Sequence, residues 1–171
     1  MMNHKGKTIL GFIAGMGLLT GLDQWTKKLV VDNLKGHEPL VIWDGVFEFF
    51  YSENRGAAFG ILQGKHGFFF LVAAVVFAAV IYAMWRLPET KRYLPLKVCL
   101  TLIAAGAAGN FIDRAVQGYV VDFLYFKLID FPIFNVADCY VTVATAVLLF
   151  LLLVFYSDEE LDMLRPGRKG L

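Results

Sequence analysis

Histidine and cysteine are scarce in this chain of 171 residues. The three histidines, His4, His37 and His66, and the two cysteines, Cys99 and Cys139, are scattered along it. A His-based metal site or a Ser-His-Asp triad needs such residues in a recognisable motif, and no such motif is present. One cysteine lies inside an apolar run, so no disulfide framework is indicated either. These residues therefore predict neither a metal site nor a disulfide-bonded fold.

Charge is also scarce, and it is almost balanced. Asp, Glu, Lys and Arg make up 18% of the residues, the net charge is +1, and hydrophobic residues reach 58%. In soluble domains, charged residues make up about a quarter. The balance gives no basic surface for nucleic acid. The length suits one domain, so we expect residues 1–171 to form a single membrane domain.

Long apolar runs account for this composition. Phe68 to Trp85 is 18 residues without a charge, enough for a membrane span. The first run follows a basic N-terminus but ends in Leu22-Asp23-Gln24 without a small-residue cleavage site, which predicts an uncleaved helix. The third contains the small-residue face Ala104 to Gly109, which favours close helix packing. We expect four transmembrane helices, over about residues 8–31, 68–86, 94–113 and 135–156.

Residues 38–62 are predicted to form a small β region outside the membrane. Asp44-Gly45 lies between Leu40 to Trp43 and Val46 to Tyr51, two runs rich in β-favouring residues. An Asp-Gly pair in this setting predicts a hairpin with a type I′ turn. Its aromatic residues favour packing on the helices or at the headgroup level.

Lys and Arg are distributed unevenly between the two sides of the expected bundle. Nine lie in the two ends and the 86–97 loop, and the other seven lie in the last part of the first span and in the two longer connections. The 86–97 loop alone holds four basic residues against one acid. The positive-inside rule therefore predicts that both termini are cytoplasmic and that the hairpin faces the outer side.

Polar residues gather between Asn110 and Asp138, with apolar runs on both sides. Asn-x-x-Asp occurs twice there, as Asn110/Asp113 and Asn135/Asp138, and residues three apart share a helical face. Asn135 is expected to N-cap the last helix and to place Asp138 at N3. At N3 the free backbone N–H groups and the helix dipole favour an ionised carboxylate.

Two ion pairs are expected beside this stretch. Asp23 and Lys27 are four apart on one face of the first helix. We interpret them first as an interfacial pair that helps to end the span, and second as a brace for a site. Asp113 lies at the C-terminal end of the third span, where the dipole disfavours a carboxylate, and Arg114 is expected to compensate it.

Asp122, in Val-Val-Asp-Phe, has no basic neighbour in the sequence, so desolvation is expected to raise its pKa. An ionised Asp138 and a protonated Asp122 would suit an aspartyl protease, in which one carboxylate deprotonates water and the other polarises the scissile carbonyl. Each acid taken singly has a structural explanation, as a helix-start residue, an ion-pair partner or a solvated loop residue. Their grouping with asparagines and an arginine favours a site.

Two other functional classes compete with this interpretation. A small transporter or channel subunit would use the four acids Asp23, Asp113, Asp122 and Asp138 as a relay. Relay groups should be spread through the depth of the membrane, whereas these gather at one end. A non-catalytic scaffold would bind a partner through the aromatic hairpin, but it would leave the paired aspartates and asparagines unexplained.

The chain resembles the lipoprotein signal peptidases (signal peptidase II), which are membrane aspartyl proteases of bacteria. This resemblance implies a mainly α, polytopic fold with four transmembrane helices and an extracytoplasmic β-hairpin or β-cradle, without cofactor or metal. Five motifs in order carry it: Leu22-Asp23-Gln24 with Lys27, Asn54-x-Gly56-Ala57-Ala58-Phe59, Gly109-Asn110-Phe-Ile-Asp113-Arg114, Val120-Val-Asp122-Phe123 and Phe134-Asn135-Val-Ala-Asp138.

The resemblance also implies an activity and its residues. The substrate would be a prolipoprotein whose cysteine carries diacylglycerol, cleaved just before that cysteine at the outer face of the cytoplasmic membrane. We expect a monomer that contacts this substrate and membrane lipids but no nucleic acid, with a lateral groove beside the second and third spans for acyl chains. Cys139 stands where the family usually has Ser. The catalytic residues would be Asp122 and Asp138, and the substrate-binding or supporting residues Asn54, Gly56, Asn110, Arg114, Asn135, Asp113, Asp23 and Lys27.

Overall fold

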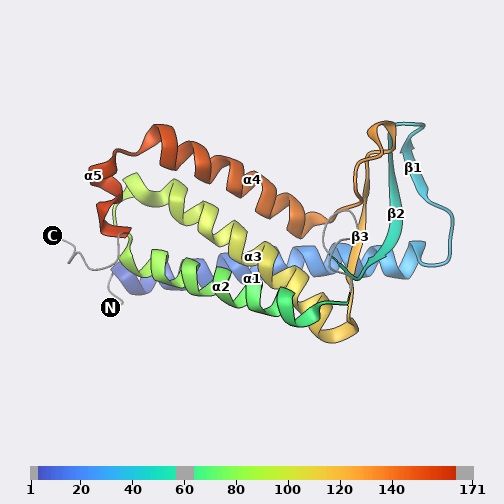
Figure 1. The fold of residues 1–171 in the computed structure, drawn as a ribbon, viewed down its shortest axis with the longest axis horizontal. Helices are drawn as coiled ribbons and strands as arrows, with labels where there is room; N and C mark the ends of the chain where they lie inside the picture. Colours follow the sequence, from blue (N-terminus) through green and yellow to red (C-terminus); the bar gives the residue numbers. More distant parts are fainter. Residues whose placement is uncertain (1–3, 57–63, 165–171) are drawn as a thin grey trace.

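The structure is a computed structural model that describes residues 4–56 and 64–164. Its longest elements run alongside one another as a helix bundle (Figure 1). The motif residues Ala57, Ala58 and Phe59 and the end of the expected β region lie outside the described residues. The long helices of the described part are α1 (His4–Leu34), α2 (His66–Arg86), α3 (Leu94–Gln117) and α4 (Val136–Phe150), and a short α5 (Asp158–Leu161) follows.

Within the described residues, three of these helical segments are long and apolar enough to cross a membrane: Gly67–Arg86, Lys91–Gln117 and Val136–Phe155. The last continues α4 through a π-helical turn, Leu151–Phe155. Although α1 has 31 residues, it is not among the three. Its second half carries Asp23, Gln24, Lys27 and Lys28, and these polar residues lower its mean hydropathy.

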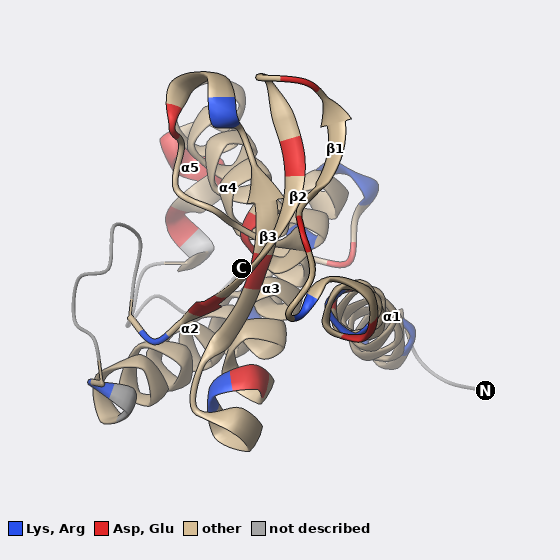
Figure 2. Cartoon of the chain, turned by 90° about the vertical axis from the view of Figure 1, so that its right-hand side faces the viewer, with Lys and Arg blue, Asp and Glu red and all other residues tan. Residues whose placement is uncertain are grey.

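Three antiparallel strands lie at one end of the bundle, in the order β1-β2-β3 (Figure 1). They are β1 (Leu40–Trp43), β2 (Phe47–Asn54) and β3 (Val120–Tyr125). The start of α1 and α5 lie at the opposite end. Figure 2 looks onto the sheet, which crosses in front of the helices and carries acidic residues on β2 and β3.

The hairpin between β1 and β2 forms where the sequence predicts it, but its turn differs. The N–H of Val46 donates to the carbonyl of Trp43 at 2.9 Å, which closes a turn over Asp44 and Gly45. Gly45 has a positive φ of 69°, whereas Asp44 has not. A type I′ turn needs positive φ at both central residues, so that prediction is wrong. The irregular register between Val41 and Trp43 accommodates the twist instead.

The third strand was not predicted, although it carries Asp122. Its pairing with β2 places Val120 opposite Asn54 and Asp122 opposite Ser52. A buried apolar cluster of Val30, Val121 and Phe123 packs β3 against α1. This packing holds one face of β3 against the bundle. Asp122, which lies between Val121 and Phe123 in the strand, points toward the ends of the helices.

Helix α3 lies at the centre of the bundle, and its small residues allow close helix contacts. A Cβ on Gly106 would come within 2.5 Å of the carbonyl oxygen of Ala137, in α4. A Cβ on Gly109 would overlap Oδ2 of Asp23, in α1. Close packing at the Ala104 to Gly109 face is therefore confirmed, and the neighbours that need it are α4 and α1.

Candidate active site

Asn135 starts α4 as the sequence predicts. Its Oδ1 accepts a hydrogen bond from the N–H of Asp138 at 3.0 Å, and Oδ2 of Asp138 accepts from the N–H of Asn135 at 3.2 Å. This reciprocal pair is a capping box with Asp138 at N3. The helix start therefore holds the Asp138 carboxylate in one orientation.

The second oxygen of Asp138 faces α3. Its Oδ1 accepts a hydrogen bond from Nδ2 of Asn110 at 2.8 Å. Two N–H donors thus point at this carboxylate, one from the backbone and one from a side chain. Hydrogen bonds donated to a carboxylate favour its charged form.

Asp122 lies on β3 with only 3% of its surface exposed. Its Oδ1 accepts from Nδ2 of Asn135 at 2.6 Å, and its Oδ2 accepts from Nδ2 of Asn54 at 2.9 Å. Burial raises the pKa of the Asp122 carboxyl to about 7, and the negative charge of Asp138 adds to the effect. Near neutral pH, Asp122 therefore exists in both protonation states.

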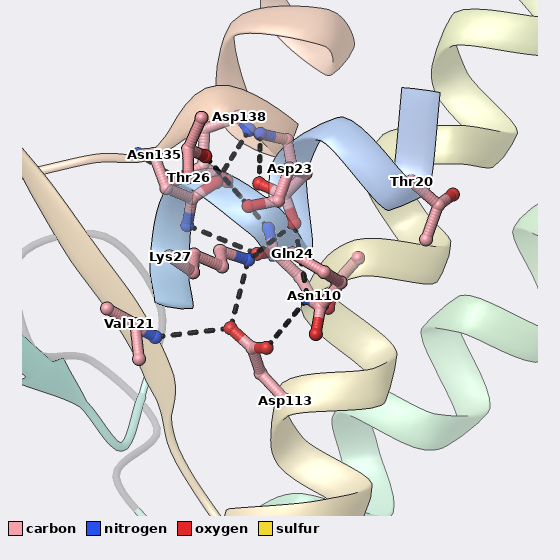
Figure 3. A network of polar contacts seen from close by, with 12 residues as sticks. Thr20, Asp23, Gln24, Thr26, Lys27, Asn110, Asp113, Val121, Asn135 and Asp138 are labelled. Carbon is pink, nitrogen blue, oxygen red and sulfur yellow. Dashed lines mark hydrogen bonds and ion pairs between the residues drawn. The ribbon is translucent and has the colours of Figure 1, made fainter. Parts of the chain in front are cut away.

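A chain of amide hydrogen bonds joins the two carboxylates. Nδ2 of Asn135, which binds Asp122, also lies 3.2 Å from Oδ1 of Asn110, and Asn110 in turn donates to Asp138. Figure 3 shows Asn110, Asn135 and Asp138 converging from α3 and α4. The structure thus brings together Asn54, Asn110, Asp122 and the pair Asn135 and Asp138, which come from four separate segments of the chain.

Lys27 stands at the centre of a second, buried group (Figure 3). Its Nζ lies 2.9 Å from Oδ2 of Asp23 and 2.9 Å from Oδ2 of Asp113, and it donates to Oδ1 of Asn110 at 3.0 Å. Asp23 is fully buried, Lys27 is 3% exposed, and α1 continues past both to Leu34. Burial against α3 and the start of α4 favours the second interpretation, a brace for a site, over a pair that only helps to end the span.

Arg114 is not the ion-pair partner of Asp113, contrary to the expectation from their adjacency, and only its longer-range charge acts on that carboxylate. Neighbours in a helix point in different directions, and Lys27 takes the place beside Asp113. Arg114 instead donates to the carbonyl of Gly56 at 2.9 Å, and its guanidinium lies 4.2 Å from the ring centroid of Phe69. It therefore holds the end of β2 against α2 and α3.

Gln24 is a site residue that sequence reasoning missed. Its Nε2 donates to Oδ1 of Asp113 at 2.9 Å and to the carbonyl of Gly109 at 3.2 Å. The only signal was its position beside Asp23 in a recognised motif. Gly56, at the other side, donates its N–H to Oδ1 of Asn54 at 2.9 Å and so orients the amide that binds Asp122.

A cavity of about 120 Å³ opens between α2 and α3 next to this site. Apolar side chains such as Phe69, Val76 and Phe111 line it, and Asn110 and Arg114 form its polar end. Within residues 4–56 and 64–164, the site included, no three His, Cys, Asp or Glu side chains gather as metal ligands would.

The Signal peptidase (SPase) II family model matches residues 16–155. The lipoprotein signal peptidase of Streptococcus thermophilus strain CNRZ 1066 is 43% identical over 142 residues, which cover 83% of this chain and 90% of that protein. That of Brevibacillus brevis is 43% identical over 153 residues, which cover 90% and 94%. This chain belongs to the signal peptidase II family.

Solved structures agree with this assignment at the level of the fold. Two, both described as bacterial membrane enzymes determined by the in meso method, give TM-scores of 0.73. Their identities are 30% and 32%, over 88% and 86% of this chain and 93% and 96% of theirs. As a signal peptidase II family member, the protein is a peptidase of lipoprotein processing, and its apolar helices are those of a membrane-embedded protein.

Proposed function

We propose that this signal peptidase II family member is an aspartyl endopeptidase. It removes the signal peptide of a prolipoprotein by cutting just before a cysteine that carries diacylglycerol. The observation that carries the proposal is the bridged carboxylate pair, in which Asn135 donates to Asp122 at 2.6 Å and Asn110 donates to Asp138 at 2.8 Å. Two carboxylates in unlike surroundings are the arrangement that acid/base peptide hydrolysis requires.

In the proposed mechanism, Asp138 is the general base and Asp122 the general acid. Ionised Asp138 takes a proton from a water molecule, whose oxygen attacks the scissile carbonyl carbon. Protonated Asp122 donates its proton to the carbonyl oxygen as the C–O double bond opens. When the tetrahedral intermediate collapses, the C–N bond breaks, the new amine takes the proton held by Asp138, and Asp122 takes back a proton from the hydroxyl that becomes part of the product carboxyl group. The pKa of about 7 for Asp122 supports its role as the acid.

The residues around the pair would hold the substrate. Asn54 and Asn110 present amides that a peptide backbone can bind. The hydrogen bond from Arg114 to the Gly56 carbonyl lies at the polar edge of the proposed substrate site. We assign the cavity between α2 and α3 to a short part of one acyl chain of the substrate lipid, since its volume of about 120 Å³ holds only a few methylene groups. Diacylglycerol would then hold the scissile bond at the height of the aspartates, which lie at the sheet end of the bundle.

For the topology, we propose four membrane spans, with α1 as the fourth because its buried Asp23 and Lys27 pair inside the protein rather than facing lipid. Both termini would be cytoplasmic, and the site would face the extracytoplasmic side of the bacterial cytoplasmic membrane. We propose that the protein acts as a monomer, since every side chain assigned to the site comes from one chain.

The test mixes purified protein in detergent with a lipidated prolipoprotein and sizes the product on a gel. Wild type should release a fragment whose mass matches cleavage just before the lipidated cysteine. Asp122→Asn and Asp138→Asn should leave the substrate intact, as should an unlipidated Cys→Ser substrate with the wild-type enzyme. Substantial cleavage by either aspartate variant would refute the aspartyl mechanism. An intact substrate with wild type would refute the proposed cleavage of a lipidated prolipoprotein.

A further inference from the structure

Two buried carboxylates hold the backbone one residue before each proposed catalytic aspartate. Oδ2 of Asp113 accepts from the N–H of Val121 at 3.2 Å, directly before Asp122. Oδ1 of Asp23 accepts from the N–H of Ala137 at 2.9 Å, directly before Asp138. Asp113 is 4% exposed and Asp23 is fully buried, so neither carboxylate can exchange these partners for bulk water.

One cation joins these two carboxylates. Lys27 Nζ lies 2.9 Å from Asp23 and 2.9 Å from Asp113 (Figure 3). Its third contact, to Oδ1 of Asn110 at 3.0 Å, turns the Nδ2 of that amide toward Asp138. The ammonium of Lys27 is thus connected to β3 through the Asp113 carboxylate and to the start of α4 through the Asp23 carboxylate.

We propose that Lys27 is a positioning residue that sets the spacing of Asp122 and Asp138. This inference rests on the aspartyl mechanism proposed above. The first connection runs from Lys27 through Asp113 to β3, and the second runs from Lys27 through Asp23 to α4. Lys27 needs no contact with either proposed catalytic carboxylate, because it acts on the backbone that carries each of them.

The proposed positioning role requires the positive charge of Lys27. Without an ammonium between them, the carboxylates of Asp23 and Asp113 would repel each other in a buried environment. They would move apart, and each would draw with it the backbone segment that it binds. A displacement of about 1 Å in a catalytic group can cost about a hundredfold in rate even when the mutated residue lies away from the chemistry.

The test compares Lys27→Met with Lys28→Met in the prolipoprotein cleavage assay. Lys28 is the matched control, because it pairs with the residue four positions on, Asp32, but is 72% exposed. We expect Lys27→Met to lower kcat by about a hundredfold, with a smaller rise in KM because Lys27 also orients Asn110, a proposed substrate contact. Lys28→Met should behave as wild type. Equal kcat values for the two variants would overturn the proposal.

A double-mutant cycle separates positioning from simple charge balance. Asp23, Lys27 and Asp113 together carry one negative charge, and Lys27→Met with Asp113→Asn restores that total. If Lys27 only neutralises charge, the double variant should match or exceed Asp113→Asn in kcat, which would overturn the proposal. If it positions the pair, the double variant should fall below Asp113→Asn because the connection to α4 is also lost.

Two controls distinguish a loss of positioning from unfolding of the variant and from failure of the aspartyl mechanism. Melting temperatures show whether each variant is folded. If Lys27→Met alone does not fold, the proposal is tested by comparing the kcat of the Lys27→Met/Asp113→Asn double variant with that of Asp113→Asn. Asp122→Asn and Asp138→Asn run in the same assay. If these two still cleave, the aspartyl mechanism fails. If they do not cleave but Lys27→Met does at the wild-type rate, only the positioning role fails.

Discussion

The buried carboxyl of Asp122 should make the stability of the protein depend on pH in a way that Asp122→Asn removes. Its pKa of about 7 lies well above the ordinary value of 3.8, because burial, and then the charge of Asp138, disfavour ionisation. Both oxygens accept hydrogen bonds from side-chain amides, so the group does not depend on water for its partners. Asparagine has nearly the same shape and no charge to desolvate.

The sign and the size follow from linkage. A group whose pKa is higher in the folded state stabilises the fold most below its unfolded pKa, and this contribution is lost as the pH rises through the folded pKa. Between pH 3.8 and about 7 the free energy of unfolding should therefore fall. At about 1.4 kcal/mol per pH unit, the full loss is of the order of 4 kcal/mol. The stability of Asp122→Asn relative to wild type should therefore rise by this amount between about pH 4 and about 7, above a cost that is constant with pH because the Asn NH₂ cannot accept the hydrogen bond donated by Asn54 or Asn135.

Thermal unfolding in detergent at a series of pH values between about 4 and 9 measures this difference. The melting temperature of Asp122→Asn minus that of wild type should rise through the neutral range and then level off. Asp44→Asn removes an exposed carboxylate from the β1–β2 turn and serves as the control for the loss of an acid that is not buried. A flat difference for Asp122→Asn would refute the reasoning, because it would mean that burial does not perturb this carboxyl in the folded state.

Two further substitutions test the packing and the hydrogen bonds of the site. Gly109→Ala should cost about 1–3 kcal/mol of stability, because its Cβ would overlap Oδ2 of Asp23. Gly17→Ala, where nothing lies within 4 Å of the new Cβ, should be neutral or stabilising by up to about 1 kcal/mol, because Ala favours a helix interior more than Gly does. Equal melting temperatures for the two variants would contradict the close approach. Asn54→Ala removes a donor at 2.9 Å from Asp122 and should lower kcat roughly ten- to a hundredfold in the cleavage assay. A kcat within about twofold of wild type would show that this donor is dispensable.

The features that the sequence predicted well are those whose partners are close together in the chain. The capping box of Asn135 and Asp138 spans three positions, and helix-start chemistry acts at that distance. The hairpin was found for the same reason, since its turn joins neighbouring runs. Its turn type was missed because the backbone at Asp44 is set by the twist and the irregular register of the whole hairpin, not by the Asp-Gly pair alone.

The features that were missed depend on residues distant in the chain. Lys27 was assigned to Asp23, four residues away, but its second partner Asp113 lies on another helix. Arg114 was assigned to Asp113 because they are adjacent, although adjacent side chains on a helix diverge. Strand β3 pairs with β2 across about 70 residues, and no local pattern encodes such a partner.

The two aspartates differ because different kinds of backbone hold them. Asp138 lies in the first turn of a helix, where free N–H groups are available, whereas Asp122 lies in a strand and relies on side-chain amides. Asn135 serves both, since its Oδ1 caps α4 and its Nδ2 binds Asp122. Turning this amide over would direct its NH₂ at the N–H of Asp138 and its oxygen at the Asp122 carboxylate, and both contacts would be lost. The first turn of α4 therefore fixes the donor that faces Asp122, so the geometry of the pair forms together with the start of that helix.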